Sequence, residues 1–280
     1  MKFACHRLLF RPSVFKGSLG DIIELVSSVG FEGIEVGFEE IQNSVWSPQR
    51  FAGALEKYKI SLSSSYWGGP FYDPSQHQKL VEEARSVAKM LQRLGCRHLL
   101  IVPPSRNQLG DFDKAAKQKY IKSMAQCLNR IGGNLKDYDV QIGVHNYWGD
   151  LVEDRRGIGL LMEATDPDFV GFAPDTGHLG IIGCDVIETF ETYRDRINLV
   201  HLKDISEPGL PVPLSDDWSV RGRDLGEGDI DFVALMRILK EAGYNDWCVY
   251  EQDFGTTPVE SAIKAKTYID RFLRPIFQEK

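Results

Sequence analysis

Short apolar runs alternate with amphipathic stretches along the whole chain, and this alternation constrains the fold more than any other feature. The apolar runs recur at a spacing of roughly 30 residues, which is the length of a strand–helix–strand unit with parallel strands. The predicted strands are residues 3–5, 33–36, 60–66, 98–102, 140–144, 169–173, 197–202 and 247–250. The predicted helices, where apolar residues recur at helical spacing, are 21–29, 48–58, 76–94, 112–135, 157–164, 186–193, 232–242 and 259–273.

Eight strands in strict alternation with eight helices predict an α/β fold, a (β/α)8 barrel. A doubly wound open sheet is the competing architecture, but no G-x-G-x-x-G segment follows the first strand. The length of 280 residues suits one barrel, and no linker, low-complexity tract or change of composition divides the chain. We therefore predict one domain over residues 1–280, with residues 204–228 as a long functional or mobile loop.

Composition and charge restrict the class of protein. The chain is 42% hydrophobic and 26% charged, which is typical of a soluble globular protein. Its net charge of −7 and pI near 5.5 argue against a nucleic-acid surface. The five cysteines form no C-x-x-C pair, no apolar run approaches the ~20 residues of a membrane span, and no signal peptide is evident. We expect a cytoplasmic protein that binds neither nucleic acid nor membranes, and the sequence leaves a homo-oligomer open.

Ionisable side chains follow the predicted strands, at the end where a barrel builds its site. Asp175 and His201 close two consecutive strands, so we expect them side by side. Glu251 follows the last apolar run directly, and His145 ends the fifth strand. Carboxylates and imidazoles without cysteine suit one divalent ion of Mn, Mg, Co or Zn. Other residues at or just beyond the strand ends are His6, Glu35, Trp67, Trp148, Glu153, His178, Lys203 and Asp253.

These residues also have structural interpretations. Asp175 could cap the next helix, and His201 could be a core histidine with its hydrogen bonds satisfied. Glu35 could pair with a neighbouring arginine, and the tryptophans could pack in the barrel rim. Such roles are common for single residues, but the repetition of Asp175 and His201 at the same end of consecutive strands favours a functional site.

Several segments resemble the xylose isomerase-like barrel superfamily over nearly the whole chain. They are GFEGIE at 30–35, DTGH at 175–178, VHLKD at 200–204, GEGDIDF at 226–232 and the terminal-strand Glu251. That superfamily contains sugar isomerases, ketose 3-epimerases, inosose dehydratase, dehydroshikimate dehydratase and endonuclease IV. The resemblance implies one divalent metal, held by a glutamate after strand five and by Asp175, His201 and Glu251 after strands six to eight.

The strand-five segment departs from the epimerase pattern, because His145 stands where many epimerases carry glutamate. Residues 145–153 are instead similar to the H-x-H-x-G-T-x-x-E segment of inosose dehydratase relatives, with Tyr147 and Asp150 as departures. Strand-end geometry favours His145 as the fourth ligand. The resemblance and the charge of a third carboxylate favour Glu153, which we predict, with His145 as an acid–base group or supporting donor. Glu153 could instead pair with the arginines at 155–156.

The residues and the resemblance together predict a metal-dependent isomerase, epimerase or dehydratase of a sugar, keto-sugar or cyclitol. The metal would polarise a ketone and stabilise the enediolate formed when a base removes the α-proton. The alternatives are an endonuclease IV-like nuclease, which needs more metal ligands and a basic groove, and a silent barrel that serves as a binding subunit. The predicted catalytic residues are Glu251, His145 and His178; the substrate-binding residues are His6, Trp67, Trp148, Lys203 and Arg223; the metal ligands are Glu153, Asp175, His201 and Glu251.

Overall fold

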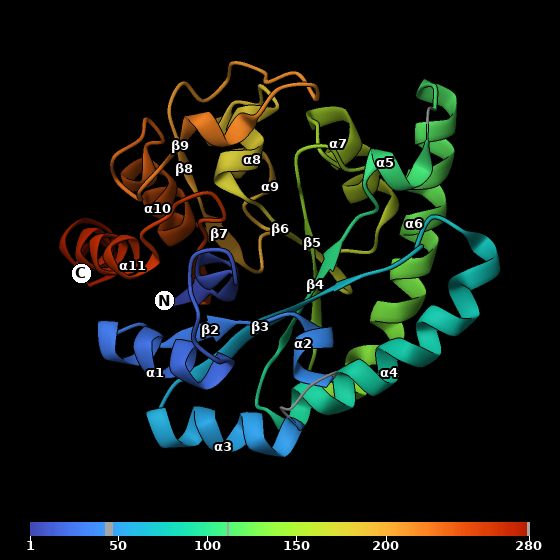
Figure 1. The fold of residues 1–280 in the computed structure, drawn as a ribbon. Helices are drawn as coiled ribbons and strands as arrows, with labels where there is room; N and C mark the ends of the chain where they lie inside the picture. The colour runs from blue at the N-terminus through green and yellow to red at the C-terminus, as the bar shows by residue number, and fades with distance from the viewer. Residues whose placement is uncertain (43–46, 111, 279–280) are drawn as a thin grey trace.

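Eight parallel strands form the centre of the molecule and helices surround them, as the computed structural model shows (Figure 1). The structure describes residues 1–42, 47–110 and 112–278. This arrangement confirms the predicted (β/α)8 barrel. The barrel strands are β1 (Lys2–His6), β2 (Gly33–Glu35), β3 (Ser61–Gly68), β4 (His98–Val102), β5 (Gln141–His145), β6 (Val170–Ala173), β7 (Val200–Leu202) and β10 (Trp247–Tyr250).

The strand order is β6-β5-β4-β3-β2-β1-β10-β7, so the chain returns to its first strand through β10. The seam between β6 and β7 is held by single bridges, which join Phe172 to Ile197 and Asp175 to His201. In the second bridge the His201 amide donates to the Pro174 carbonyl at 2.9 Å. The prediction that Asp175 and His201 lie side by side is therefore confirmed.

Most helices follow the predicted apolar periodicity. In α4 the residues Leu80, Ala84, Val87 and Leu91 are buried against the barrel, and Gly95 adopts a left-handed conformation just beyond the helix. Proline begins α3, behind a serine cap. The helices are α1 (Leu19–Val29), α2 (Phe38–Gln42), α3 (Pro48–Tyr58), α4 (His77–Arg93), α5 (Arg106–Leu109), α6 (Lys114–Leu135), α7 (Arg155–Ala164), α8 (Thr176–Ile181), α9 (Val186–Tyr193), α10 (Phe232–Glu241) and α11 (Pro258–Tyr268).

The short elements escaped prediction because they carry less than two turns of apolar periodicity. The helices α2, α5 and α8 all lie just after barrel strands. The predicted loop at 204–228 contains a small antiparallel pair, β8 (Asp204–Ile205) and β9 (Gly222–Arg223). These elements build the rim of the barrel mouth, where the predicted site residues stand.

The barrel interior is divided along its axis. Its apolar part is filled by small, aliphatic and aromatic side chains, among them Ala4, Leu100, Ala173, Leu199 and Trp247, which are buried together. The carboxyl ends of the strands carry the ionisable residues instead. A larger apolar core lies between the strands and the surrounding helices. No helix in the described part of the chain is long and apolar enough to cross a membrane.

Candidate active site

Four buried side chains converge at the carboxyl ends of β5, β6, β7 and β10. They are His145, Asp175, His201 and Glu251, and one donor atom from each lies within 4.8 Å of the other three. The Nδ1 atom of His201 is 2.6 Å from Oε2 of Glu251, and Nε2 of His145 is 3.8 Å from Oδ2 of Asp175. Consecutive strands of a barrel project their ends to one mouth, which is why residues so distant in the sequence meet.

This four-residue donor cluster fits a divalent metal. Both ring nitrogens of His145 and the Oδ2 atom of Asp175 are buried without a hydrogen-bond partner. The other oxygen of Asp175 accepts from the His178 amide at 2.8 Å, so Asp175 does cap α8 while its second oxygen faces the cluster. Burying unsatisfied polar atoms is costly unless a ligand completes them. Imidazole nitrogens and carboxylate oxygens are donors that transition metals accept.

Glu35 supports the donor cluster from β2. Its carboxylate is fully buried, with Oε2 at 3.0 Å from Nε2 of His201 and Oε1 at 3.0 Å from Nε2 of His6. The Ser64 hydroxyl also donates to it. Burial acts to lower the pKa of His201, but the carboxylates of Glu35 and Glu251 outweigh it and raise that pKa to about 10. The second nitrogen of His6 accepts from the Leu8 amide at 2.9 Å, so both its nitrogens are engaged within the protein.

Lys203 lies fully buried beside the donor cluster. Its ammonium donates to Oε1 of Glu251 and to Nε2 of His178, both at 2.8 Å. Trp218 from the long loop covers this pair, with its ring centroid 5.2 Å from the Lys203 nitrogen. Burial, followed by the Lys203 charge, lowers the pKa of His178 to about 3, so its ring is neutral. His178 was predicted to be catalytic and Lys203 to bind substrate, but neither is among the residues that line the neighbouring cavity.

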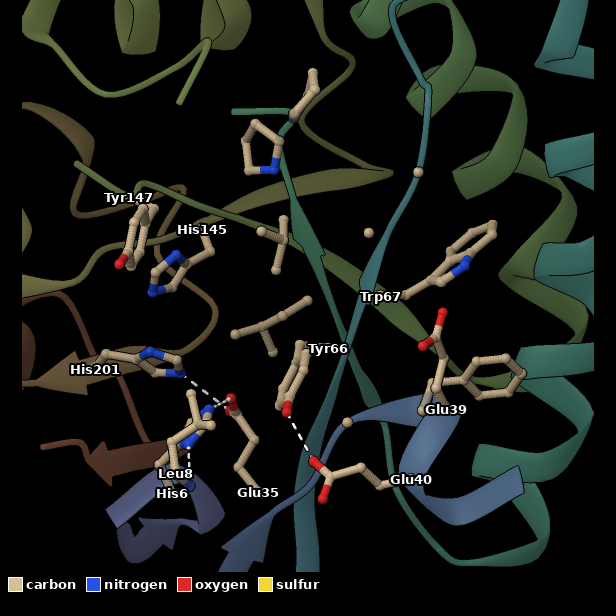
Figure 2. A pocket seen from close by; sticks show the side chains of 18 of the residues that line it. His6, Leu8, Glu35, Glu39, Glu40, Tyr66, Trp67, His145, Tyr147 and His201 are labelled. Atoms are coloured by element: carbon tan, nitrogen blue, oxygen red, sulfur yellow. Dashed lines mark hydrogen bonds and ion pairs between the residues drawn. The ribbon is translucent and has the colours of Figure 1, made fainter. Parts of the chain in front are cut away.

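A cavity of about 710 Å³ opens beside the donor cluster (Figure 2). Tyr147, His145 and His201 lie on one side of it, and Trp67 with Glu39 on the other. Tyr66 donates from its hydroxyl to Glu40 at 2.9 Å between them. No lysine or arginine of the described residues lines the cavity. The ionisable and aromatic lining residues are His6, Glu35, Phe38, Glu39, Glu40, Tyr66, Trp67, Tyr72, His145, Tyr147, His201, Glu251 and Asp253.

Three predicted site residues lie elsewhere. Glu153 is buried outside the donor cluster, where it accepts from the Gly149 amide at 2.7 Å and pairs with Arg106 rather than with its chain neighbours. Trp148 donates to the Val212 carbonyl at 3.1 Å, and it is not among the cavity lining. Arg223 donates to carbonyls of its own loop, at 2.8 Å for Gly222. Of the two tryptophans predicted to bind substrate, Trp67 lines the cavity and Trp148 does not.

The structure also brings in residues to which sequence reasoning assigned no role. Asp253 reaches the cavity and lies 3.5 Å from the Lys203 ammonium; its position two residues after Glu251 was the available signal. Tyr147 faces the cavity with its ring 4.2 Å from that of His178. Trp218 is 8% exposed within a polar loop, and an isolated tryptophan in such a loop was the signal for it.

The chain matches a known family over most of its length. Residues 23–270 match the family described as xylose isomerase-like TIM barrel. The chain belongs to that family. Among curated relatives in the family, inosose dehydratase of Geobacillus kaustophilus is 30% identical over 90% of this chain and 86% of its own. Inosose dehydratase of Clostridium tetani is 36% identical over 86% and 85%.

Solved structures of other proteins share the fold at lower identity. IolI protein with a bound zinc atom superposes with a TM-score of 0.78, at 19% identity over the full length of both chains. A probable 3-DHS dehydratase, AsbF of Bacillus anthracis, gives 0.76 at 16% identity, over 97% of this chain and 99% of its own. At this identity the likeness concerns the barrel fold alone.

Proposed function

We propose that this chain is a divalent-metal-dependent dehydratase that removes water from a keto-cyclitol. The convergence of His145, Asp175, His201 and Glu251 at the edge of the cavity carries the proposal. The inosose dehydratase relatives, which align over most of both chains, support the reaction class. The zinc atom of IolI supports a metal in a barrel of this shape.

The cavity lining supports an uncharged polyol as substrate. Phosphate or carboxylate recognition normally uses arginine, lysine or a helix N-terminus, and no lysine or arginine of the described residues lines the cavity. The lining instead offers carboxylates, tyrosine hydroxyls and an indole. Carboxylates accept hydrogen bonds from sugar or cyclitol hydroxyls, and Trp67 offers a flat apolar surface for the C–H face of a ring.

In this proposal His145, Asp175, His201 and Glu251 hold the metal. Bound there, it would polarise the ketone and stabilise the negative charge that develops when the neighbouring C–H bond breaks. Two imidazoles among four ligands favour Mn²⁺, Co²⁺ or Zn²⁺ over Mg²⁺. Glu35 keeps the Nε2 proton of His201 engaged, so that Nδ1 points to the donor cluster.

Glu251 is the proposed base. It lines the cavity, and its two oxygens face His201 and Lys203, which keep it ionised. It takes the proton from the carbon next to the ketone. The β-hydroxyl then leaves with a proton from the Tyr147 hydroxyl, and return of the Glu251 proton to Tyr147 through solvent completes the loss of one water.

Dehydration is favoured over 3-epimerisation by the residue at the end of β5. Epimerisation through two carboxylates needs one on each face of the reacting carbon. Here β5 ends in His145, and the nearby carboxylate of Glu153 is held by Arg106 and the Gly149 amide. One cavity-facing carboxylate base in the donor cluster, with the Tyr147 hydroxyl donor at the same cavity, suits an elimination better.

The test uses metal-depleted protein reloaded with Mn²⁺, Co²⁺ or Zn²⁺ and given an inosose or a ketohexose in D₂O. We expect metal-dependent loss of one water from the inosose, observed by mass spectrometry and NMR. Glu227→Gln, which changes a surface carboxylate paired with Lys264, serves as the matched control for Glu251→Gln. Deuterium uptake by the ketohexose without loss of water would replace dehydration by isomerisation or epimerisation. Failure of all substrates with every metal would refute the proposal.

A further inference from the structure

A second group of potential metal donors adjoins the donor cluster. It consists of His178, Glu251 and Asp253, whose donor atoms also lie within 4.8 Å of one another. Glu251 belongs to both groups and presents a different oxygen to each: Oε2 toward His201 and Oε1 toward Lys203. A carboxylate shared in this way is the arrangement by which two metal ions about 3.5–4 Å apart are held together in two-metal enzymes.

The ammonium of Lys203 stands inside this second group. It is 2.8 Å from Glu251 and from His178, 3.4 Å from Oδ2 of Asp175 and 3.5 Å from Oδ1 of Asp253. The side chain is fully buried. We propose that Lys203 is a built-in cation that takes the place of a second metal ion, and so limits the site to one metal. This inference rests on the metal site of the proposed function.

Two sequence motifs hold the ammonium in this place. The Thr176 hydroxyl donates to the Lys203 carbonyl at 2.7 Å and accepts from the Lys203 amide at 3.0 Å. Gly177 leaves the space through which the lysine stem passes, because a Cβ atom there would lie 2.6 Å from Cγ of Lys203. The D-T-G-H segment at 175–178 and the H-L-K-D segment at 201–204 therefore pack against each other around the Lys203 side chain.

Charge explains why a cation is needed there. Asp175, Glu251 and Asp253 are three neighbouring carboxylates, and of these only Asp175 and Glu251 would bind a divalent ion held by the donor cluster. Buried carboxylates without a partner are strongly unfavourable. A lysine nitrogen supplies the positive charge that Asp253 and the second oxygen of Glu251 require, but it offers no open coordination position. A one-metal site of this kind suits removal of a proton next to a ketone, whereas two-metal displacement at a phosphodiester needs the position that Lys203 fills.

The experiment counts metal ions. Metal-depleted wild-type protein and Lys203→Met are titrated with Mn²⁺, the bound ions are counted by elemental analysis after equilibrium dialysis, and spin coupling between neighbouring ions is recorded by EPR. We expect one uncoupled ion per wild-type chain and two coupled ions per chain in Lys203→Met. Adding Asp253→Asn to Lys203→Met should return the count to one. Lys264→Met, at an exposed lysine that pairs with Asp224 and Glu227, is the matched control and should keep one.

The outcomes separate this inference from the proposed function. One ion in both wild type and Lys203→Met, with the circular dichroism of a folded barrel, overturns the inference and leaves the proposed function standing. Two ions in the wild type overturn it as well. No ion in the wild type defeats the proposed metal site itself. If Lys203→Met does not fold, Lys203→Asn tests the same point, because its amide frees the space while remaining polar.

Discussion

The two sides of the barrel mouth differ in chemistry. The side formed by β5, β6, β7 and β10 carries the donor cluster and Lys203, all deeply buried and linked by ion pairs. The side formed by β2, β3 and β4 carries Tyr66, Trp67 and three prolines along the cavity wall. Figure 2 shows the separation, with His201 and Trp67 at opposite ends of the view. In the proposed function, the first side performs the chemistry and the second selects the ring of the substrate.

The largest effect should come from Glu251→Gln. The amide is close in size but is a poorer metal ligand and cannot take a proton, so turnover should fall by about 10²–10⁴-fold or more. The measurement is the rate of inosose dehydration at saturating metal, with the folded state checked by circular dichroism. Turnover close to that of wild type would exclude Glu251 as the base. The residue that removes the proton would then have to lie outside this side of the barrel mouth.

A comparison of His145→Ala with Glu153→Ala tests which residue after β5 holds the metal. His145 has two buried nitrogens without partners, whereas Glu153 is already bound by Arg106 and Gly149. We expect His145→Ala to weaken metal binding by more than the roughly 10–100-fold that loss of an outer hydrogen-bond partner costs. Glu153→Ala should lower thermal stability but keep the metal. Loss of metal in Glu153→Ala alone would restore the ligand predicted from the sequence.

Glu35→Gln should have a smaller effect than loss of a direct ligand. Glutamine can still accept from His201 or His6, but it removes the charge that orients and polarises the His201 ring. We expect metal affinity to fall by about 10–100-fold, with the barrel still folded. Calorimetric titration of the metal-depleted variant with metal measures this affinity. An unchanged affinity would show that Glu35 contributes structure alone and does not support the donor cluster across the mouth.

The smallest effect should come from Trp67→Leu, on the wall far from the donor cluster. Loss of the indole removes a flat surface that stacks on the ring, with a free energy of about 0.5–1.5 kcal/mol. We expect KM for the inosose to rise by the corresponding roughly two- to tenfold, with kcat and metal content unchanged. A fall in kcat with constant KM would mean that this wall takes part in the chemistry. Because Trp67 packs on Phe71, thermal stability is measured alongside.

The barrel could be predicted because its strands and helices are long enough to show their periodicities. The pairing of Asp175 with His201 followed from their places at the ends of consecutive parallel strands, and it needed no knowledge of the loops. Metal-capable donors from β6, β7 and β10 were predictable for the same reason. The roles of His6 and Lys203 were not, because they depend on partners contributed by other strands.

The segment after β5 marks the limit of such reasoning. Asp150 is buried and accepts from the amides of Tyr147 at 2.9 Å and Val152 at 2.6 Å, while Gly149 turns the chain at a positive φ of 88°. This tight loop pairs with Ser105 and directs Glu153 to Arg106. The seven residues between His145 and Glu153 could not reveal that direction, since it depends on a contact with a distant helix.

The sequence by itself therefore determined the barrel and the three donors that end β6, β7 and β10, because strand direction and side-chain alternation are local properties. Only the tertiary structure decided that His145 joins these three donors and that Trp218 covers His178 and Lys203. It also decided that Arg223 and Trp148 donate hydrogen bonds to backbone carbonyls. These placements depend on loops whose course is set by hydrogen bonds and ion pairs to residues far away in the chain. The physical reason is that a strand end has one direction available to it, whereas a loop takes the direction in which its buried polar groups find partners.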